Sequence, residues 1–167
     1  MTAMTGAQYH AAAAKLAFDT QAFIGGKYVP SLSGKTFETE NPATGKTITK
    51  VAECDSADVD LAVKAARKAF ESGSWSRMAP RERKKTLLRF ADLIERDLQE
   101  LAVMETLDCG KPILDSLNVD LPDTIETLRW HAEVIDKLYD QVSPTPHDVV
   151  SMIIREPIGV VGTVLPW

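Results

Sequence analysis

The sequence predicts an α/β fold, and two observations carry that prediction. Before residue 55, short runs of alternating polar and apolar residues are separated by turn-forming clusters, which is typical of strands. From 55 to 139, apolar residues recur every three or four positions, as they do along helices. Near the end, the run GVVGTVL at 159–165 is apolar on both faces, and such a strand belongs in a covered, usually parallel sheet.

The first part of the chain is predicted to form one short helix and a small β meander. Residues 7–18 (AQYHAAAAKLAF) are mostly good helix formers. Three strand-like runs follow, at 23–29, 35–40 and 47–52, and clusters of Pro, Ser, Gly and Asn separate them. We expect these three runs to pair as consecutive antiparallel strands.

Three long helices are predicted between residues 55 and 140. Asp55 suits the N-cap of the first helix, and Gly73 suits its end. Pro80 fits the first turn of the second helix, which continues through an apolar stripe to Gly110. Pro112 begins the third helix, whose apolar stripe is the most regular in the chain and runs to residue 139. Pro122 inside it is expected to kink the helix, because its ring removes one hydrogen bond and crowds the turn before it.

The last 25 residues are predicted to contain a linker and two strands. SPTPH at 143–147 is the linker, 149–155 alternates weakly, and 159–165 is the strand that is apolar on both faces. A buried parallel strand needs neighbours, and no other part of the sequence supplies one. We therefore interpret the chain as the beginning of a larger protein.

Composition and charge exclude several classes of protein. The 167 residues are 44% hydrophobic and 26% charged, within the ordinary globular range. Nineteen basic and 24 acidic side chains give a net charge of −5, which leaves no basic stripe for a nucleic-acid partner. No apolar run approaches the roughly 18 residues that cross a bilayer, so we expect no membrane helix. Two cysteines and no secretion signal predict a reduced, cytoplasmic protein.

The residues by themselves reveal no reaction centre. The three histidines have no metal-ligand spacing with either cysteine, and no glycine-rich phosphate loop is present. Cys54 and Cys109 each lie at the edge of a predicted helix, where a small structural residue is the favoured interpretation over a reactive thiol. Composition and spacing alone leave the function open.

Residues 155–167 (REPIGVVGTVLPW) resemble the segment that leads into the catalytic centre of NAD(P)-dependent aldehyde dehydrogenases. The stretches from FIGGKYVPSLSGKTFETENPATGK onward and WSRMAPRERKKTLLRFADLIERDLQELAVMETLDCGKP are similar to the N-terminal part of that family in order and spacing. The resemblance covers residues 20–167. METLDCGKPILDS and the long spacing to EPIGVVGTVLPW are similar to the aminoaldehyde branch, especially the enzymes that oxidise gamma-glutamyl-gamma-aminobutyraldehyde in putrescine breakdown.

The resemblance implies a domain plan and an assembly. Residues 1–20 would be an N-terminal helix or tail, and 21–140 the first part of the cofactor-binding domain. Residues 141–157 would begin a β-arm for oligomerisation, and 158–167 would be a truncated strand that enters the Rossmann-like parallel sheet of the cofactor domain. The complete protein would be a homodimer or homotetramer.

The resemblance also implies a reaction. In the family, a cysteine thiolate attacks the aldehyde to form a thiohemiacetal, an asparagine amide stabilises the oxyanion, and a glutamate activates water. The asparagine would follow Trp167 directly, and Cys54 and Cys109 do not match the nucleophile's motif. No catalytic residue is therefore predicted in this chain, and the chain alone is predicted to be inactive.

Some binding positions match the family's pattern. Contacts to NAD or NADP are predicted at the end of the last strand, and a monovalent cation is predicted between two backbone carbonyls and one carboxylate. Asp120 and Asp123 match aspartates that attract a cationic amine at the mouth of the substrate tunnel, although two solvated helix carboxylates are an equally good interpretation. The cofactor residues are Val164, Leu165, Pro166 and Trp167, and the cation residues are Thr39, Glu40 and Asp108.

Two other functions stay open. The chain could be a non-catalytic assembly or interaction module derived from this fold, because an unpaired strand is a natural docking edge. An acyl-transferring relative that does not release the free acid is the other alternative, since the residues that decide between them are missing.

Overall fold

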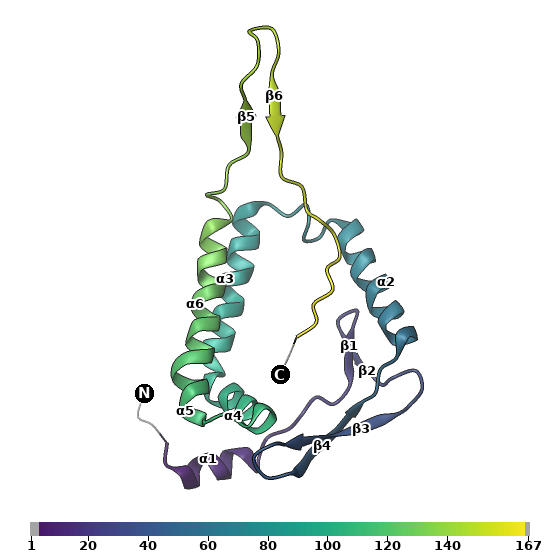
Figure 1. Ribbon diagram of the computed structural model, residues 1–167, viewed down its shortest axis with the longest axis vertical. Helices are drawn as coiled ribbons and strands as arrows, with labels where there is room; N and C mark the ends of the chain where they lie inside the picture. Colours follow the sequence, from purple (N-terminus) through teal and green to yellow (C-terminus); the bar gives the residue numbers. More distant parts are fainter. Residues whose placement is uncertain (1–3, 166–167) are drawn as a thin grey trace.

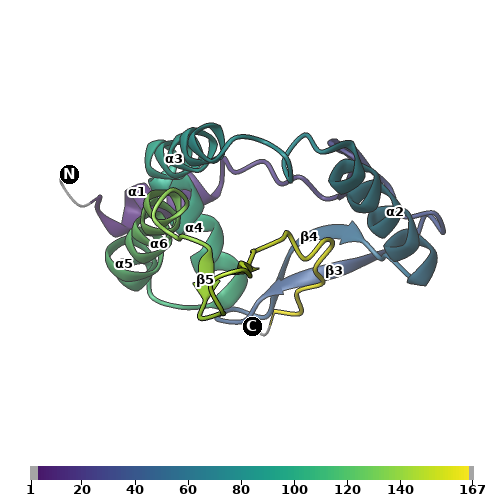
Figure 2. The ribbon, with the colours of Figure 1, turned by 90° about the horizontal axis from the view of Figure 1, so that it is seen from above.

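The computed structural model describes residues 4–165, and its elements form an open arrangement of helices and hairpins (Figure 1). Helices α3 and α6 lie side by side on one side of the molecule, and helix α2 lies on the other, as the view from above also shows (Figure 2). The helices are α1 (Gly6–Ala13), α2 (Ser56–Ser72), α3 (Pro80–Arg96), α4 (Leu98–Cys109), α5 (Ile113–Asp115), the π-helical turn η1 (Ser116–Asp120) and α6 (Leu121–Val134). The strands are β1 (Ala22–Ile24), β2 (Lys27–Val29), β3 (Thr36–Asn41), β4 (Lys46–Ala52), β5 (Gln141–Ser143) and β6 (Ser151–Ile153).

The predicted three-stranded meander is wrong, because its first run is itself a hairpin. Strands β1 and β2 pair with each other around Gly25 and Gly26, whose φ angles are 62° and 82°. Two consecutive residues with positive φ make the tight turn that glycine permits at no steric cost. Strands β3 and β4 form a second antiparallel pair, and residues 4–165 contain no parallel pair.

The predicted helix ends are confirmed where capping chemistry is strong. Asp55 accepts a hydrogen bond from the backbone N–H of Ala57 and forms a capping box with Asp58 at the start of α2. Gly73 and Gly110 close α2 and α4 in the left-handed conformation, and Pro80 is the first residue of α3. Helix α1 ends five residues before its predicted end, at Ala13.

The predicted second helix is in fact two helices. Asp97 leaves the helical conformation (φ −98°, ψ 13°) and separates α3 from α4. Its carboxylate accepts two hydrogen bonds from the guanidinium of Arg96, at 2.8 and 2.6 Å. The apolar stripe continues across this break in the sequence, so periodicity alone did not reveal it.

The predicted third helix is also interrupted, at the π-helical turn η1. The N–H of Leu121 donates to the carbonyl of Ser116, five residues earlier, which is the π pattern. Pro122 follows η1 directly as the second residue of α6, and the backbone stays right-handed helical through this junction. The regular α-helical pattern is therefore disturbed in the turn just before the proline, where its ring crowds the backbone.

The core is small and lies between α3, α4 and α6. Its buried apolar side chains are Ala91, Ala102, Val103, Ile125 and Ala132. Helices α3 and α6 run antiparallel, and ion pairs join their outer edges. Lys84 lies 2.7 Å from Glu133, and Arg129 lies 2.6 Å from Glu95.

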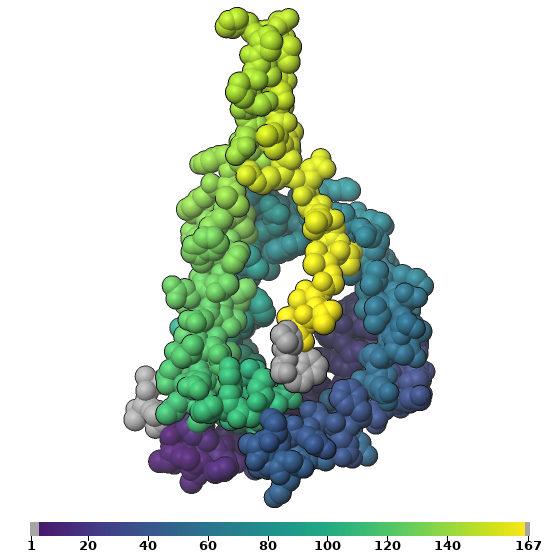
Figure 3. Space-filling model, in the orientation of Figure 1, coloured from purple at the N-terminus to yellow at the C-terminus, as the bar shows by residue number. Residues whose placement is uncertain are grey.

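Two C-terminal segments leave the helical body. Strands β5 and β6 form a projecting hairpin. Strand β5 ends at the first residue of the predicted linker, and β6 is shorter than the strand predicted at 149–155. The strand predicted over 159–165 is not formed, because no neighbouring strand among residues 4–165 accepts its hydrogen bonds. Ile158 and Val164 are 91% and 97% exposed, and open space flanks this segment in Figure 3.

Candidate functional site

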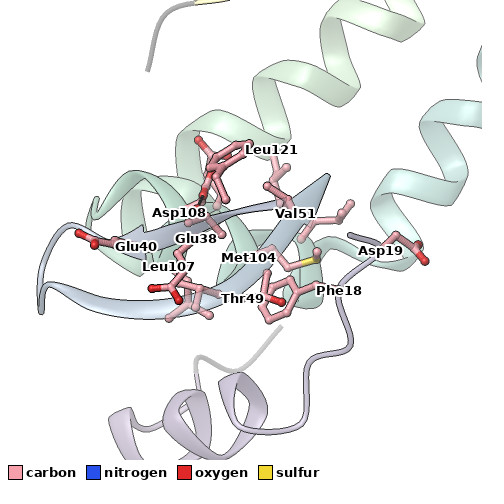
Figure 4. A pocket seen from close by; sticks show the side chains of 15 residues that line it. Phe18, Asp19, Glu38, Glu40, Thr49, Val51, Met104, Leu107, Asp108 and Leu121 are labelled. Atoms are coloured by element: carbon pink, nitrogen blue, oxygen red, sulfur yellow. Dashed lines mark hydrogen bonds between the residues drawn. The ribbon is translucent and has the colours of Figure 1, made fainter. Parts of the chain in front are cut away.

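A pocket of about 780 Å³ lies between the β3–β4 hairpin and helix α4 (Figure 4). Its apolar lining includes Phe18, Met104 and Leu121. The carboxylates of Glu38, Glu40, Glu105 and Asp108 add negative charge to its wall, as does Asp19. The lining of the pocket therefore combines apolar side chains with carboxylates.

The structure brings the three predicted cation residues to this pocket. The hydroxyl of Thr39 donates a hydrogen bond of 3.2 Å to Oδ1 of Asp108, which ties β3 to α4 although the two residues are 69 positions apart. Glu40, the next residue after Thr39 along β3, also lines this pocket. The ladder between β3 and β4 shifts register between these two residues, so a β-bulge interrupts the regular pairing of their backbone.

This donor set suits a hard monovalent cation. Carboxylate, hydroxyl and backbone carbonyl oxygens are the ligands that such ions take, and the bulge is the kind of local irregularity that leaves a carbonyl outside the ladder. Residues 4–165 contain no group of three or more His, Cys, Asp or Glu side chains that could hold a metal ion. No pattern in the sequence predicted the bulge between Thr39 and Glu40.

The two predicted substrate aspartates have different surroundings. Asp120 caps α6 in helical backbone conformation, and its carboxylate accepts a hydrogen bond of 2.6 Å from the ammonium of Lys111. Asp123 is exposed and lines a separate hollow of about 330 Å³ on α6, beside Glu126 and Trp130. Sequence reasoning missed the partner of Asp120, because nine residues and a π-helical turn separate it from Lys111 and no helical spacing connects them.

The surroundings of both cysteines raise the pKa of the thiol. Partial burial and the charges of Asp58 and Asp55 raise the pKa of Cys54. A hydrogen bond to the carboxylate of Glu105, 3.3 Å away, is the main cause that raises the pKa of Cys109. Because the thiolate is the reactive form, these surroundings agree with the interpretation that neither cysteine is the catalytic nucleophile.

The Glu105→Gln variant is expected to speed alkylation of Cys109 by iodoacetamide at pH 8 about threefold. Removing the carboxylate lowers the pKa of Cys109 and so raises its thiolate fraction at that pH. Peptide mass spectrometry after timed quenching gives the rate at each cysteine. Cys54 serves as the internal control, and an equal acceleration at both cysteines would contradict the assigned cause.

A comparison with known protein families shows to which family the chain belongs. Residues 28–167 match the model of the aldehyde dehydrogenase family. The chain belongs to the aldehyde dehydrogenase family. The resemblance seen in the sequence is thereby confirmed.

Individual aldehyde dehydrogenases are similar to this chain along almost its whole length. The aminoacetaldehyde dehydrogenase of Pseudomonas aeruginosa is 54% identical over 96% of this chain. A solved structure of the indole-3-acetaldehyde dehydrogenase AldA of P. syringae, in complex with NAD+, is 50% identical over 94% of the chain with a TM-score of 0.91. The gamma-glutamyl-gamma-aminobutyraldehyde dehydrogenase of Burkholderia cenocepacia is 44% identical over 93%, also with a TM-score of 0.91.

The chain spans only about a third of the length of these aldehyde dehydrogenases. It covers 32% of each of the three proteins. The matched stretch is their N-terminal part. The aldehyde dehydrogenase fold predicted from the sequence is confirmed for that portion.

Of the four predicted cofactor residues, the structure describes two. Val164 and Leu165 are exposed, and the described part of the chain builds no closed cleft around them. Pro166 and Trp167 lie outside the described residues. No helix among residues 4–165 is long and apolar enough to cross a membrane.

Proposed function

We propose that this chain is the N-terminal part of an enzyme that oxidises an aldehyde to its carboxylic acid. The aldehyde and one water would give the acid, while a hydride passes to NAD or NADP and a proton is released. The observation that carries the proposal is the family match over residues 28–167 together with the close structural similarity to an NAD+-bound dehydrogenase. The dinucleotide would supply hydride acceptance, and Val164, Leu165, Pro166 and Trp167 would line its cleft.

The exposed surface supports the view that further protein covers this chain in the active enzyme. A compact monomer of 18.3 kDa exposes about 8,100 Å². This chain exposes 12598 Å², and its exposed large apolar residues include Ile158, Val161 and Val164. Exposing so much apolar surface to water is unfavourable, so a covering partner or domain would stabilise the chain.

We further propose that the substrate carries an amine or a gamma-glutamylamino group. Two of the three relatives named above act, by their names, on aldehydes of that kind. The exposed carboxylate of Asp123 and the neighbouring Asp120 supply negative charge that would attract a cationic amine. The relative named for indole-3-acetaldehyde makes an uncharged aromatic aldehyde the competing substrate class.

Kinetics of the full-length enzyme test this proposal. Asp120→Asn/Asp123→Asn is expected to raise KM for 3-aminopropanal about fivefold, because the exposed carboxylate of Asp123 and, more weakly, the Lys111-paired carboxylate of Asp120 no longer attract its ammonium. Butanal has the same number of heavy atoms in its chain and no charge, so it is the matched substrate. NADH absorbance gives both rates. Equal losses for both substrates would contradict the amine proposal, and no NADH from any aldehyde would contradict the enzyme proposal itself.

A monovalent cation is proposed at Thr39, Glu40 and Asp108. The 3.2 Å contact between Thr39 and Asp108 and the adjacent bulge support it. The ion would fix the β3–β4 hairpin against α4 and so hold the pocket wall in place.

A homodimer or homotetramer in the cytoplasm is proposed for the complete enzyme. Support comes from the β5–β6 hairpin, which projects from the body and exposes Val142, Met152 and Ile153. The same hairpin favours the second candidate function, a non-catalytic assembly module, because unpaired strand edges with apolar side chains are docking surfaces.

A further inference from the structure

We infer that residues 5–19 form a strap that docks reversibly across helix α4. The strap consists of helix α1 and the extended chain that follows it. When it is docked, its Phe18 closes one side of the pocket between α4 and the β3–β4 hairpin. The inference concerns a conformational change of this chain and does not depend on the proposed reaction.

The path of the strap joins two hollows on different faces of α4. Helix α1 packs against α4. Leu16 lines a hollow of about 360 Å³ together with Val103 of α4. Two residues further along, Phe18 lines the pocket of about 780 Å³, where it lies beside Met104 of α4 (Figure 4). The strap therefore crosses α4 between Leu16 and Phe18.

The chain that follows α1 is fixed at its far end. Leu16, Phe18 and Thr20 are half-buried, and the residues between them are exposed, as in an extended segment with one face toward the protein. The carbonyl of Thr20 accepts a hydrogen bond of 2.8 Å from the N–H of Ala52 at the end of β4. This bond keeps residue 20 in place, so helix α1 is the end of the strap that can leave α4.

Helix α1 has little buried surface to hold it on α4. It contains eight residues, and helices of this length are marginal in water without tertiary packing. None of its residues is buried. The capping box joins Thr5 to Gln8 within the strap itself, so it stabilises the helix in the docked and in the undocked state alike.

Tyr9 makes docking less favourable. Its side chain is half-buried, and its hydroxyl oxygen is buried without a hydrogen-bond partner among residues 4–165. An undocked helix leaves this hydroxyl in water, so docking removes hydrogen bonds to water that the protein does not replace. The docked strap is therefore in equilibrium with an undocked form, as is typical of segments with few buried contacts.

Timed digestion of the full-length enzyme with a low concentration of trypsin measures undocking at Lys15, which lies between α1 and Leu16. The protease cuts the open form, so the rate follows its population. Tyr9→Phe removes the unpartnered hydroxyl and is expected to slow this cleavage about fivefold. Phe18→Ala removes the apolar contact in the pocket and is expected to speed it about tenfold. Tyr139→Phe is the matched control, because Tyr139 is 80% exposed, and it should leave the rate unchanged.

Oxidation of Met104 by dilute hydrogen peroxide tests whether the strap closes the pocket. Met104 sulfoxide is expected to form more slowly in Tyr9→Phe and faster in Phe18→Ala, because oxidation follows the exposure of the sulfur. Met152 on β6 is 61% exposed and is the internal control. Peptide mass spectrometry gives the rate at each methionine in the same sample.

Three outcomes would overturn the inference. The first is cleavage at Lys15 that is as fast in Tyr9→Phe as in the native enzyme, or faster. The second is a native enzyme that trypsin does not cut at Lys15, since a strap that undocks would be cut. The third is oxidation of Met104 that stays constant while the cleavage rate changes, which would show that undocking does not open the pocket.

Discussion

Asp58→Ala is expected to lower the free energy of unfolding by about 3 kcal/mol, because Asp58 is a buried carboxylate that joins two parts of the fold. It is 3% exposed. Oδ1 accepts a 2.9 Å hydrogen bond from the N–H of Leu32, and Oδ2 accepts a 3.0 Å bond from the N–H of Asp55. The substitution removes both acceptors at once, and it leaves the part-buried N–H of Leu32 without its partner.

Urea unfolding followed by tryptophan fluorescence measures this effect as a change in midpoint at constant slope. Asp60→Ala is the matched control, since Asp60 lies two residues further along α2 and is exposed. The control should change stability by less than about 0.5 kcal/mol. Equal effects in the two variants would show that the hydrogen bonds of Asp58 do not stabilise the fold.

The isolated 167-residue chain is expected to form no NADH from 3-aminopropanal or butanal, whereas the full-length enzyme forms it readily. The physical reason is that oxidation of an aldehyde through a thiohemiacetal needs a thiolate nucleophile, and neither Cys54 nor Cys109 matches the nucleophile's motif of the family. NADH absorbance at matched concentrations measures both proteins. Turnover by the isolated chain at a rate near that of the full-length enzyme would refute the proposal that the catalytic residues lie outside this chain.

Light scattering on the same sample separates the two candidate functions. A monodisperse oligomer without activity would favour the assembly module, with the β5–β6 hairpin as its contact. Aggregation would favour an enzyme part whose exposed apolar surface needs the rest of the protein. That surface includes the nearly fully exposed side chains of Ile158 and Val164.

Local signals explain which elements could be predicted. Asp55, Gly73, Pro80 and Gly110 mark helix ends by chemistry that acts within a few residues, and all four lie where the sequence placed them. The hairpin at Gly25 was missed although its signal was local, because two glycines inside a run of apolar residues were interpreted as strand. The break at Asp97 has no comparable signal, since apolar spacing continues through it. Near the π-helical turn the only signal is Pro122, which predicts a disturbed helix but not a π-helical turn.

In the candidate site, too, some features could be predicted from the sequence and others only from the structure. Thr39, Glu40 and Asp108 came from the family resemblance, and the structure adds their meeting at one pocket wall and the bulge beside it. Their spacing of three residues predicts that Asp120 and Asp123 share one face of a helix. The ion pair between Asp120 and Lys111 could not be predicted from spacing. That contact depends on the path of the chain between residues 111 and 120.

The sequence by itself determined the family and the helix caps, because each depends on residue types at fixed short spacings. Only the tertiary structure decided which charges face one another and which apolar surfaces stay uncovered. Those properties arise from contacts between residues far apart in the chain, such as Thr39 with Asp108 and Leu32 with Asp58. Their energies depend on distance and burial, which no one-dimensional pattern records.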